Sequence, residues 1–236
     1  MSFNYQNYFH TFFPEISPEQ IGQLKEYVDL LKLFNKRMNL ISRVDINRIW
    51  ENHILPSTIA PKMVDFPTSS ALLDLGSGAG LPGIPLKIIR PDLQVVLVDS
   101  IRKKTLFLRK VVEQLGLKNV IVLNHRLDTK HDPHQLQEKF NIVTARAVSS
   151  IENLWRLTNC LLKPGGFLLL WKGKEDLQDL KTCALKFSFK YHIFRPSTQF
   201  FCYSTRLNHL LLFKISKGVG TGESDISENN ASTNKF

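Results

Sequence analysis

Residues 72–83 read LLDLGSGAGLPG, where an apolar run ends in a turn rich in glycine. A strand, a glycine-rich turn and a following helix are typical of the first unit of a nucleotide-binding α/β domain. Glycine has no Cβ, so such a turn lets the backbone approach a bound cofactor closely. This stretch constrains the possible folds more than any other part of the chain.

The chain after this turn repeats the same alternation of strands and helices. The expected strands are residues 71–75, 94–99, 119–124, 140–145 and 166–171. Helical stretches between them predict a mostly parallel sheet covered on both faces. After a helix near 175–187, two β-rich stretches near 190–195 and 206–215 lie too close for a crossover helix, so we expect an antiparallel hairpin. The predicted fold is α/β, with a doubly wound, Rossmann-like sheet.

Three segments can be distinguished. A helix begins at Ser17, which forms a capping-box pattern with Gln20, and residues 1–66 are expected to be a helical subdomain. Residues 67–216 hold the predicted sheet. Residues 217–236 are rich in Gly, Ser and Asn with few bulky apolar side chains, so we predict a disordered tail.

The chain is basic, with a formal net charge of +10 and a pI near 9.6. This excess favours an anionic partner, either nucleic acid or a charged membrane surface. No apolar run approaches the length of a membrane span, and the N-terminus lacks the features of a signal peptide. The three cysteines form no C-x-x-C pair. We expect a cytoplasmic protein with no membrane partner and no metal.

The glycine turn fits two cofactors. Counted from Gly78 it matches a dinucleotide-binding motif, whereas counted from Asp74 it reads D-x-G-x-G-x-G. The turn starts at Gly76, directly after the strand, which favours S-adenosylmethionine (SAM). Asp74 would provide an anion for the SAM ammonium group, and Gly76, Gly78 and Gly80 would leave bare backbone beside the adenosine. A dehydrogenase remains the alternative, although no hydride-transfer His/Lys pair is visible.

Two more acids follow predicted strands. Asp99 ends the second strand, where a carboxylate accepts hydrogen bonds from a ribose diol. Asp128 follows the third strand, where methyltransferase folds commonly bind the adenine amino group. The alternative is a doubly wound fold whose strand-end acids are simply solvated. Three carboxylates after three successive strands favour SAM.

The glycine turn with its flanks, the later RLD and FNIVTARAV, and the upstream LFNKRMNLIS and HILPS closely resemble the RsmG (GidB) family. This family methylates guanine N7 in bacterial 16S ribosomal RNA. The resemblance spans roughly residues 25–175 and implies a class I SAM-dependent methyltransferase with an N-terminal helical cap, acting on 16S ribosomal RNA or the small ribosomal subunit. It implies SAM contacts at Gly76, Leu81, Leu127, Asp128 and Arg146.

The chain departs from the family pattern at four positions. Phe34 stands in place of tryptophan, and Asp99 and Asp128 each replace a glutamate. The two acid changes keep the charge and shorten the side chain by one methylene. Pro56 stands in place of an aspartate and removes both a carboxylate and a backbone donor, which puts a role in RNA binding at that position in doubt.

Arg146 is the residue we expect at the reaction centre. Guanine N7 has an exposed lone pair and no proton to lose, so the reaction needs alignment more than a general base. TARAV follows the fourth strand where other methyltransferases have N-P-P-Y or a Pro-Cys pair. Arg146 would orient the SAM carboxylate or donate to guanine O6, and a surface arginine is the alternative. The target base must lie in a loop or leave its stack.

Cations at two places are expected to bind RNA phosphates. The helix in SIRKKTLFLRK should bury Ile101, Thr105, Leu108, Val112 and Leu115. The expected RNA-binding residues are Lys36, Arg37, Arg43, Arg102, Lys103, Arg109 and Lys110. Solvated helix faces are the alternative for each of them, and His53 is expected to be a buried, hydrogen-bonded residue.

Two other function classes stay open. A SAM enzyme acting on a small molecule or a protein would not need the cationic surface. A non-catalytic RNA-binding protein on the same scaffold would keep the cations but need not bind SAM.

Overall fold

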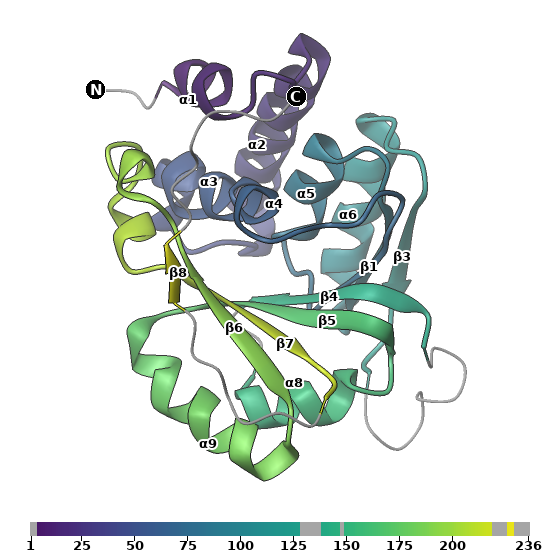
Figure 1. Ribbon diagram of the computed structural model, residues 1–236. Helices are drawn as coiled ribbons and strands as arrows, with labels where there is room; N and C mark the ends of the chain where they lie inside the picture. Colours follow the sequence, from purple (N-terminus) through teal and green to yellow (C-terminus); the bar gives the residue numbers. More distant parts are fainter. Residues whose placement is uncertain (1–3, 128–137, 147–148, 219–225, 229–236) are drawn as a thin grey trace.

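A computed structural model describes residues 4–127, 138–146, 149–218 and 226–228. In this part of the chain, eight strands form one sheet in the order β3-β2-β1-β4-β5-β7-β6-β8 (Figure 1). The strands are β1 Ala71–Leu75, β2 Gln94–Asp99, β3 Val120–Asn124, β4 Phe140–Arg146, β5 Leu162–Lys172, β6 Lys190–Arg195, β7 Leu211–Ser216 and β8 Ile226–Glu228. The first five are parallel neighbours, and β7 lies antiparallel between β5 and β6. The predicted doubly wound sheet with an antiparallel hairpin is confirmed.

Two strands differ from the predicted bounds by more than one residue. β5 already pairs with β4 at Leu162, and the register shifts before Phe167, so the strand begins four residues earlier than predicted and contains an irregularity. β7 begins at Leu211 because Thr205–Asn208 form the short 3₁₀ helix η5.

The tail contains one further strand. Ile226 of β8 lies opposite Ile193 of β6 in a parallel pairing. Within the segment predicted to be a disordered tail, residues 226–228 thus form a short strand. An edge strand needs only backbone hydrogen bonds to pair, so the polar composition of the tail did not indicate it.

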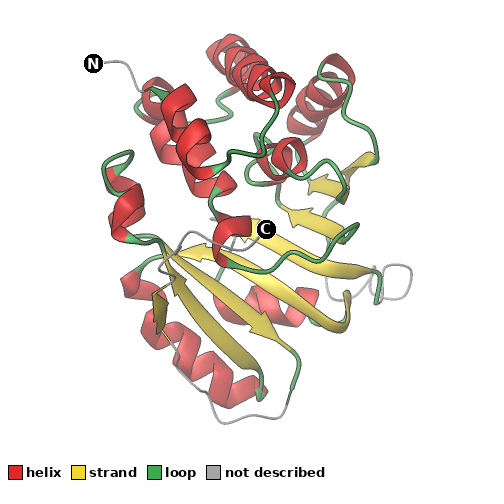
Figure 2. Cartoon of the chain, turned by 45° about the horizontal axis from the view of Figure 1, so that its top comes forward, coloured by secondary structure: helices red, strands yellow, loops and turns green. Residues whose placement is uncertain are grey.

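Helices cover both faces of the sheet (Figure 2). One face of the core contains Leu72, Leu97 and Ile142, and the other contains Leu73 and Val143, as the alternation of side chains along a strand requires. The helices are α1 Tyr5–Phe12, α2 Pro18–Met38, η1 Asp45–Arg48, η2 Trp50–Ile54, α3 Leu55–Thr58, α4 Ala60–Met63, α5 Gly83–Ile89, α6 Arg102–Gln114, α8 Ile151–Thr158, η3 Lys174–Asp176, α9 Leu177–Phe187, η4 Thr198–Phe200 and η5. Helices α8 and α9 lie below the sheet in Figure 1, and α2, α5 and α6 lie above it.

Helix α2 has the predicted capping box. Ser17 Oγ accepts a hydrogen bond from the Gln20 amide at 3.2 Å, and Gln20 Oε1 accepts one from the Ser17 amide at 2.9 Å. Near its other end, the Asn35 side chain hydrogen-bonds both the amide and the carbonyl of Ile41. These bonds turn the chain back toward the sheet after the helix.

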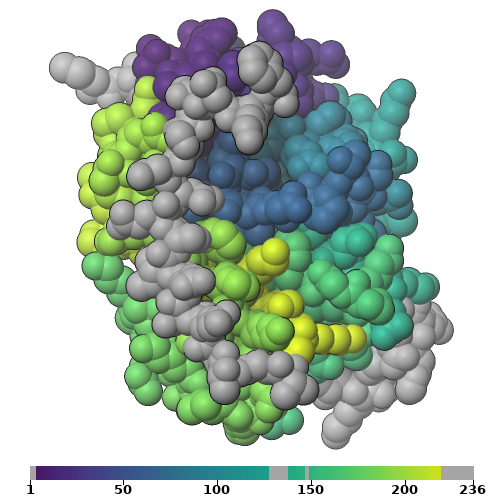
Figure 3. All heavy atoms as spheres, viewed as in Figure 1, coloured from purple at the N-terminus to yellow at the C-terminus, as the bar shows by residue number. Residues whose placement is uncertain are grey.

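The helical N-terminal part packs closely against the sheet domain. Tyr27 Oη on α2 donates to the carbonyl of Ala79 in the glycine turn at 2.8 Å, and Gln20 Nε2 donates to Ile88 O at 2.6 Å. Figure 3 shows the purple and blue atoms of the N-terminal helices directly against the teal and green atoms of the sheet domain. One hydrophobic cluster contains side chains from both parts, including Tyr8 and Leu212.

Helix α6 follows the predicted burial pattern with one exception. Thr105, Leu108 and Leu115 are buried and Val112 is half-buried, but Ile101 is 42% exposed. Ile101 precedes the helix in extended backbone, so it does not continue the helical face. In the described ranges, no helix is long and apolar enough to cross a membrane, and no metal-binding cluster forms.

Candidate active site

Two cavities meet at the carboxyl ends of β1 and β2. The glycine-loop cavity has a volume of about 500 Å³ and extends from Gly76 and Asp99 to Arg146. The Leu127 cavity has a volume of about 440 Å³. Its apolar lining comes from Leu75, Val98, Leu127, Leu154 and Leu157, and its polar lining includes His125, Arg126 and Asn153. The two cavities share Gly76, Asp99 and Ser100. Ligands of open α/β sheets bind at this edge.

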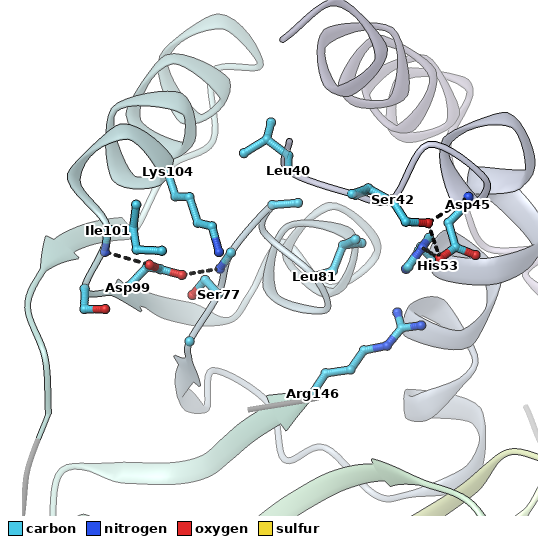
Figure 4. Close-up of a pocket in the computed structure, with 15 residues that line it drawn as sticks. Leu40, Ser42, Asp45, His53, Ser77, Leu81, Asp99, Ile101, Lys104 and Arg146 are labelled. Carbon is cyan, nitrogen blue, oxygen red and sulfur yellow. Dashed lines mark hydrogen bonds and ion pairs between the residues drawn. The ribbon is translucent and has the colours of Figure 1, made fainter. Parts of the chain in front are cut away.

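Asp99 stands between the two cavities. Its Oδ2 accepts a hydrogen bond from the Gly78 amide at 2.8 Å, and its Oδ1 accepts one from the Ile101 amide at 2.8 Å (Figure 4). A carboxylate has about four acceptor positions, so two remain available to a ligand. The carboxylate is thus fixed in place without being saturated, as a ribose-binding residue requires.

Gly76 and Gly78 form the part of the turn that lines the glycine-loop cavity. Their φ angles are +67° and +56°, in the region that favours glycine. A Cβ on Gly78 would meet only the Gly76 carbonyl oxygen, at 3.7 Å, so the surface above it is open. Bare backbone therefore faces the cavity, as the sequence predicted.

Asp74 lies elsewhere than expected. Its carboxylate is buried, accepts a hydrogen bond from Thr144 Oγ1 at 2.8 Å and another from the Gly83 amide at 3.2 Å, and lines neither cavity. Burial raises the pKa of Asp74 to about 6. This residue joins β1 to β4 and to the start of α5, and its contact with the SAM ammonium group, directly or through water, stays a prediction.

Gly80 is also a packing residue. A Cβ at this position would lie 2.6 Å from Ile84 Cγ1 and 3.2 Å from Tyr27 Oη. It lines neither cavity. Glycine is needed there because α2 and α5 approach the turn closely, which the sequence motif alone does not distinguish from cofactor contact.

Arg146 enters the glycine-loop cavity from the end of β4. Its Nη2 donates to the main-chain oxygen of Asn52 at 2.8 Å, and its Nη1 is buried without a partner in the described structure. Burial and the charge of Arg206 lower the pKa of Arg146 to about 10, so it stays charged at neutral pH. A buried unpaired donor costs about 1–3 kcal/mol, which an acceptor on a ligand would offset.

Asn52 lies on η2, a π-helical segment in which backbone hydrogen bonds run five residues back. Its main-chain oxygen accepts a hydrogen bond from Arg146. Pro56 follows on α3 and has no amide hydrogen, so it donates to no oxygen of this turn.

Asp45 is a site residue that the sequence analysis missed. Its Oδ2 accepts from Ser42 Oγ at 2.8 Å, and its Oδ1 accepts from Asn52 Nδ2 at 2.7 Å and from Arg206 Nη2 at 3.1 Å. Although partial burial opposes ionisation, the hydrogen bonds from Ser42 and Asn52 keep the pKa of Asp45 below its usual value. Asp45 is thus a fixed negative charge facing the cavity.

His53 also lines the cavity, on the π-helical segment η2. Its Nε2 lies 3.9 Å from Asp45 Oδ2 and is buried without a hydrogen-bond partner among the described residues. Burial and the charge of Arg146 lower the pKa of His53 to about 4, so the ring is neutral at pH 7. We expected a hydrogen-bonded histidine, and the structure leaves this nitrogen open. π-Helical turns often occur at functional sites, but they cannot be recognised from a repeating pattern of apolar residues in the sequence.

The remaining predicted cofactor residues divide between the cavities. Leu81 lines the glycine-loop cavity, and Leu127 lines the other. Asp128 lies outside the described residues. Lys104, which the sequence analysis passed over, points from α6 toward Ser77 and Asp99 (Figure 4).

The predicted RNA-binding cations lie on the surface beside the cavity. The side chains of Lys36, Arg37, Arg43, Arg102, Lys103, Arg109 and Lys110 are all exposed. Lys110 approaches Glu113 at 3.4 Å, an exposed pair that contributes little to stability. The cavity is lined by residues that adjoin the two clusters in sequence, namely Leu40, Ile41, Ser42, Ile101 and Lys104.

A family model described as rRNA small subunit methyltransferase G (GidB) matches residues 20–204. The chain belongs to this family. It is 36% identical over 167 residues to ribosomal RNA small subunit methyltransferase G of Lachnoclostridium phytofermentans, covering 71% of this chain and 69% of that protein. It is equally 36% identical over 168 residues to the protein of that name from Listeria monocytogenes, covering 71% of each chain. The resemblance identified from the sequence is confirmed.

Solved structures show the fold of this chain independently. A SAM-dependent methyltransferase from Aquifex aeolicus matches with a TM-score of 0.55 at 14% identity, over 81% of this chain and 98% of that one. A protein described as a predicted O-methyltransferase from Agrobacterium tumefaciens also reaches 0.55, at 15% identity, over 74% of this chain and 85% of that one. The predicted class I methyltransferase fold is confirmed.

Proposed function

We propose that this chain transfers a methyl group from SAM to N7 of a guanine in 16S ribosomal RNA of the small ribosomal subunit, and that it does so in the cytoplasm. Family membership supports the ribosomal substrate. The observation that carries the cofactor assignment is the position of Asp99, fixed by two backbone amides at the junction of two cavities.

The two cavities fit the two ends of SAM. The Asp99 carboxylate would accept hydrogen bonds from both ribose hydroxyls, and the apolar walls at Leu127 and Leu154 would enclose the adenine. Gly76 and Gly78 would place open backbone beside the adenosine, next to Asp99. When bound, SAM supplies a methyl group on a positively charged sulfur.

The other end of the glycine-loop cavity would receive the guanine. N7 carries a lone pair and no proton, so alignment and exclusion of water are the main requirements, and no residue has to act as a base. Arg146 Nη1 is a buried cation without a partner, suited to guanine O6 beside N7. The exposed cations at the ends of α2 and α6 would hold the RNA backbone around a base in a loop or out of its stack.

The experiment is methyl transfer from labelled SAM to small subunits isolated from cells that lack this protein. Reduction and aniline-induced cleavage then map N7-methylguanine in the RNA. A single cleavage in 16S ribosomal RNA is the expected result. Calorimetric titration with SAM and with NAD accompanies it, since binding of NAD in preference to SAM would contradict the cofactor assignment. SAM binding without any transfer would contradict the substrate alone.

A further inference from the structure

Three polar atoms with open hydrogen-bonding positions lie at the end of the glycine-loop cavity away from Asp99. They are Arg146 Nη1, Asp45 Oδ2 and His53 Nε2. In Figure 4, the guanidinium of Arg146 extends toward Asp45 and His53, opposite the side occupied by Asp99. Nothing in the reaction proposed so far uses Asp45 or His53.

The number of open positions on each atom is limited by its neighbours. Asp45 Oδ1 already accepts two hydrogen bonds, from Asn52 and Arg206, whereas Oδ2 accepts one, from Ser42. One acceptor position therefore remains, on Oδ2. Arg146 Nη2 is used by the Asn52 oxygen, so Nη1 is the free donor.

His53 is held as a neutral ring. Burial and the charges of Arg146 and Arg206 disfavour the protonated form more than the nearby Asp45 carboxylate favours it, which places the pKa at about 4. With its proton on Nδ1, the ring offers Nε2 as an acceptor. This acceptor lies 3.9 Å from Asp45 Oδ2, on the same wall of the cavity.

The three atoms together offer one donor and two acceptors. Guanine presents the complement along its Watson–Crick edge: the O6 acceptor, the N1–H donor and the N2 amino donor. Adenine presents an amino donor where guanine has O6 and an acceptor where guanine has N1–H, so it would leave buried groups unpaired.

We infer that Arg146, Asp45 and His53 form a subsite that recognises guanine, an inference that rests on the proposed function. Arg146 Nη1 donates to O6, Asp45 Oδ2 accepts from N1–H, and His53 Nε2 accepts from the N2 amino group. N7 lies beyond O6 on the other edge of the ring, so this arrangement leaves its lone pair free for the methyl group.

Asp45 also contributes to the reaction rate. As the N7 lone pair forms the bond to the methyl carbon, the electron pair of the carbon–sulfur bond stays on sulfur, and no proton is transferred. The guanine ring gains a positive charge, which makes N1–H a stronger donor. The hydrogen bond to Asp45 therefore strengthens in the transition state, which is the condition for catalysis rather than simple binding.

The test uses small subunits reconstituted with 16S ribosomal RNA that carries guanine or inosine at the mapped position. Inosine keeps O6, N1–H and N7 but lacks the N2 amino group. For the wild type, inosine is expected to lower kcat/KM about 10-fold, the effect of one hydrogen bond. His53→Ala is expected to cause the same loss with guanine and no further loss with inosine. His53→Asn, which keeps an acceptor, should recover part of the activity on guanine.

Asp45→Asn provides the second measurement. We expect kcat/KM on guanine to fall about 100-fold, since the lost hydrogen bond is to a charged group. The Kd for SAM should stay within about twofold, because Asp45 lies at the other end of the cavity. Glu51→Gln, which changes an acid of the neighbouring segment η2 outside the cavity, is the control. It should stay within about threefold of wild type.

The outcomes separate the two proposals. If the wild type does not methylate guanine N7, the proposed function fails. The second case is that it does, but His53→Ala acting on inosine loses kcat/KM by the product of the two separate losses. His53 then does not contact the N2 amino group, and the subsite is wrong. An unchanged rate for Asp45→Asn would also overturn the subsite.

Discussion

The two ends of the glycine-loop cavity are built differently. At the Asp99 end, the carboxylate accepts hydrogen bonds from the amides of Gly78 and Ile101. The glycine turn is itself held by a backbone hydrogen bond to β2. At the Asp45 end, the groups come from η1, η2 and β4, and two of them have buried nitrogen atoms without partners among the described residues. The Asp99 carboxylate thus holds two hydrogen bonds before any ligand binds, whereas these two nitrogen atoms hold none.

This difference indicates how each end contributes. A site whose groups are already hydrogen-bonded binds a cofactor without rearranging. Unpaired buried groups cost stability until a ligand supplies the partner, so they discriminate strongly between ligands that do and do not fit. We expect changes at the Asp99 end to affect cofactor affinity and changes at the Asp45 end to affect the rate and the choice of base.

The largest effect is expected for Arg146→Met. Loss of a charged donor to guanine O6 should lower kcat/KM for methyl transfer at least about 100-fold. If Arg146 belongs functionally to the Asp45 end, the calorimetric Kd for SAM will change by less than about threefold. A parallel loss of SAM affinity would instead assign Arg146 to the SAM carboxylate, the other role predicted from the sequence.

His53 should make the fold sensitive to mild acid. Its pKa is about 4 in the folded protein against an ordinary 6.5, so between these values the unfolded chain binds a proton that the folded chain does not. Stability must then fall as the pH drops from 6.5 toward 4. Between pH 7 and 4.5, wild type should lose about 2 kcal/mol more than His53→Gln in denaturant titrations. Parallel curves would mean that His53 is not held neutral.

The substitution Asp99→Ala should affect only the Asp99 end of the cavity. Removing the ribose contact is expected to weaken SAM binding about 10-fold, with RNA affinity unchanged. Calorimetry with SAM and filter binding of RNA measure the two quantities. Asp65→Ala, an exposed acid on the segment before β1, is the control. An unaltered Kd for SAM would remove the distinction between the two ends.

The smallest effects are expected outside the cavity. Lys103→Glu and Arg109→Glu should each weaken RNA binding several-fold and reduce the salt slope by about 1. SAM affinity should not change, because both side chains are exposed on α6 away from Asp99. Lys181→Glu, an exposed lysine on α9 beneath the sheet, is the matched control. An unchanged salt slope would place the RNA elsewhere.

The parts of the site that could be predicted from the sequence lie within short, contiguous sequence patterns. The glycine turn, the strand ends and Asp99 lie on contiguous strand-turn-helix units, whose geometry follows from a few neighbouring residues. The same turn also shows the limit, because Asp74 and Gly80 match the motif and also contact neighbouring elements of the fold. A sequence motif shows that a residue type is required at a position. It does not show whether a packing neighbour or a ligand requires it.

The Asp45 end could not be predicted in this way. Arg146 meets Asn52 across 94 positions of sequence, and η1 and η2 are 3₁₀ and π turns without the apolar periodicity of an α-helix. Helix α1 was missed for a related reason. Its aromatic side chains favour helix only weakly, and it is held by packing such as the stack of Tyr5 on Trp50 at 4.4 Å.

The contact between Arg146 and Asn52 has a consequence for mutational scanning. Its acceptor belongs to the main chain, so exchanging the side chain at position 52 leaves it in place. A scan that exchanges side chains would therefore not detect the atom that holds the arginine. Only a change in the backbone path of η2 would move it.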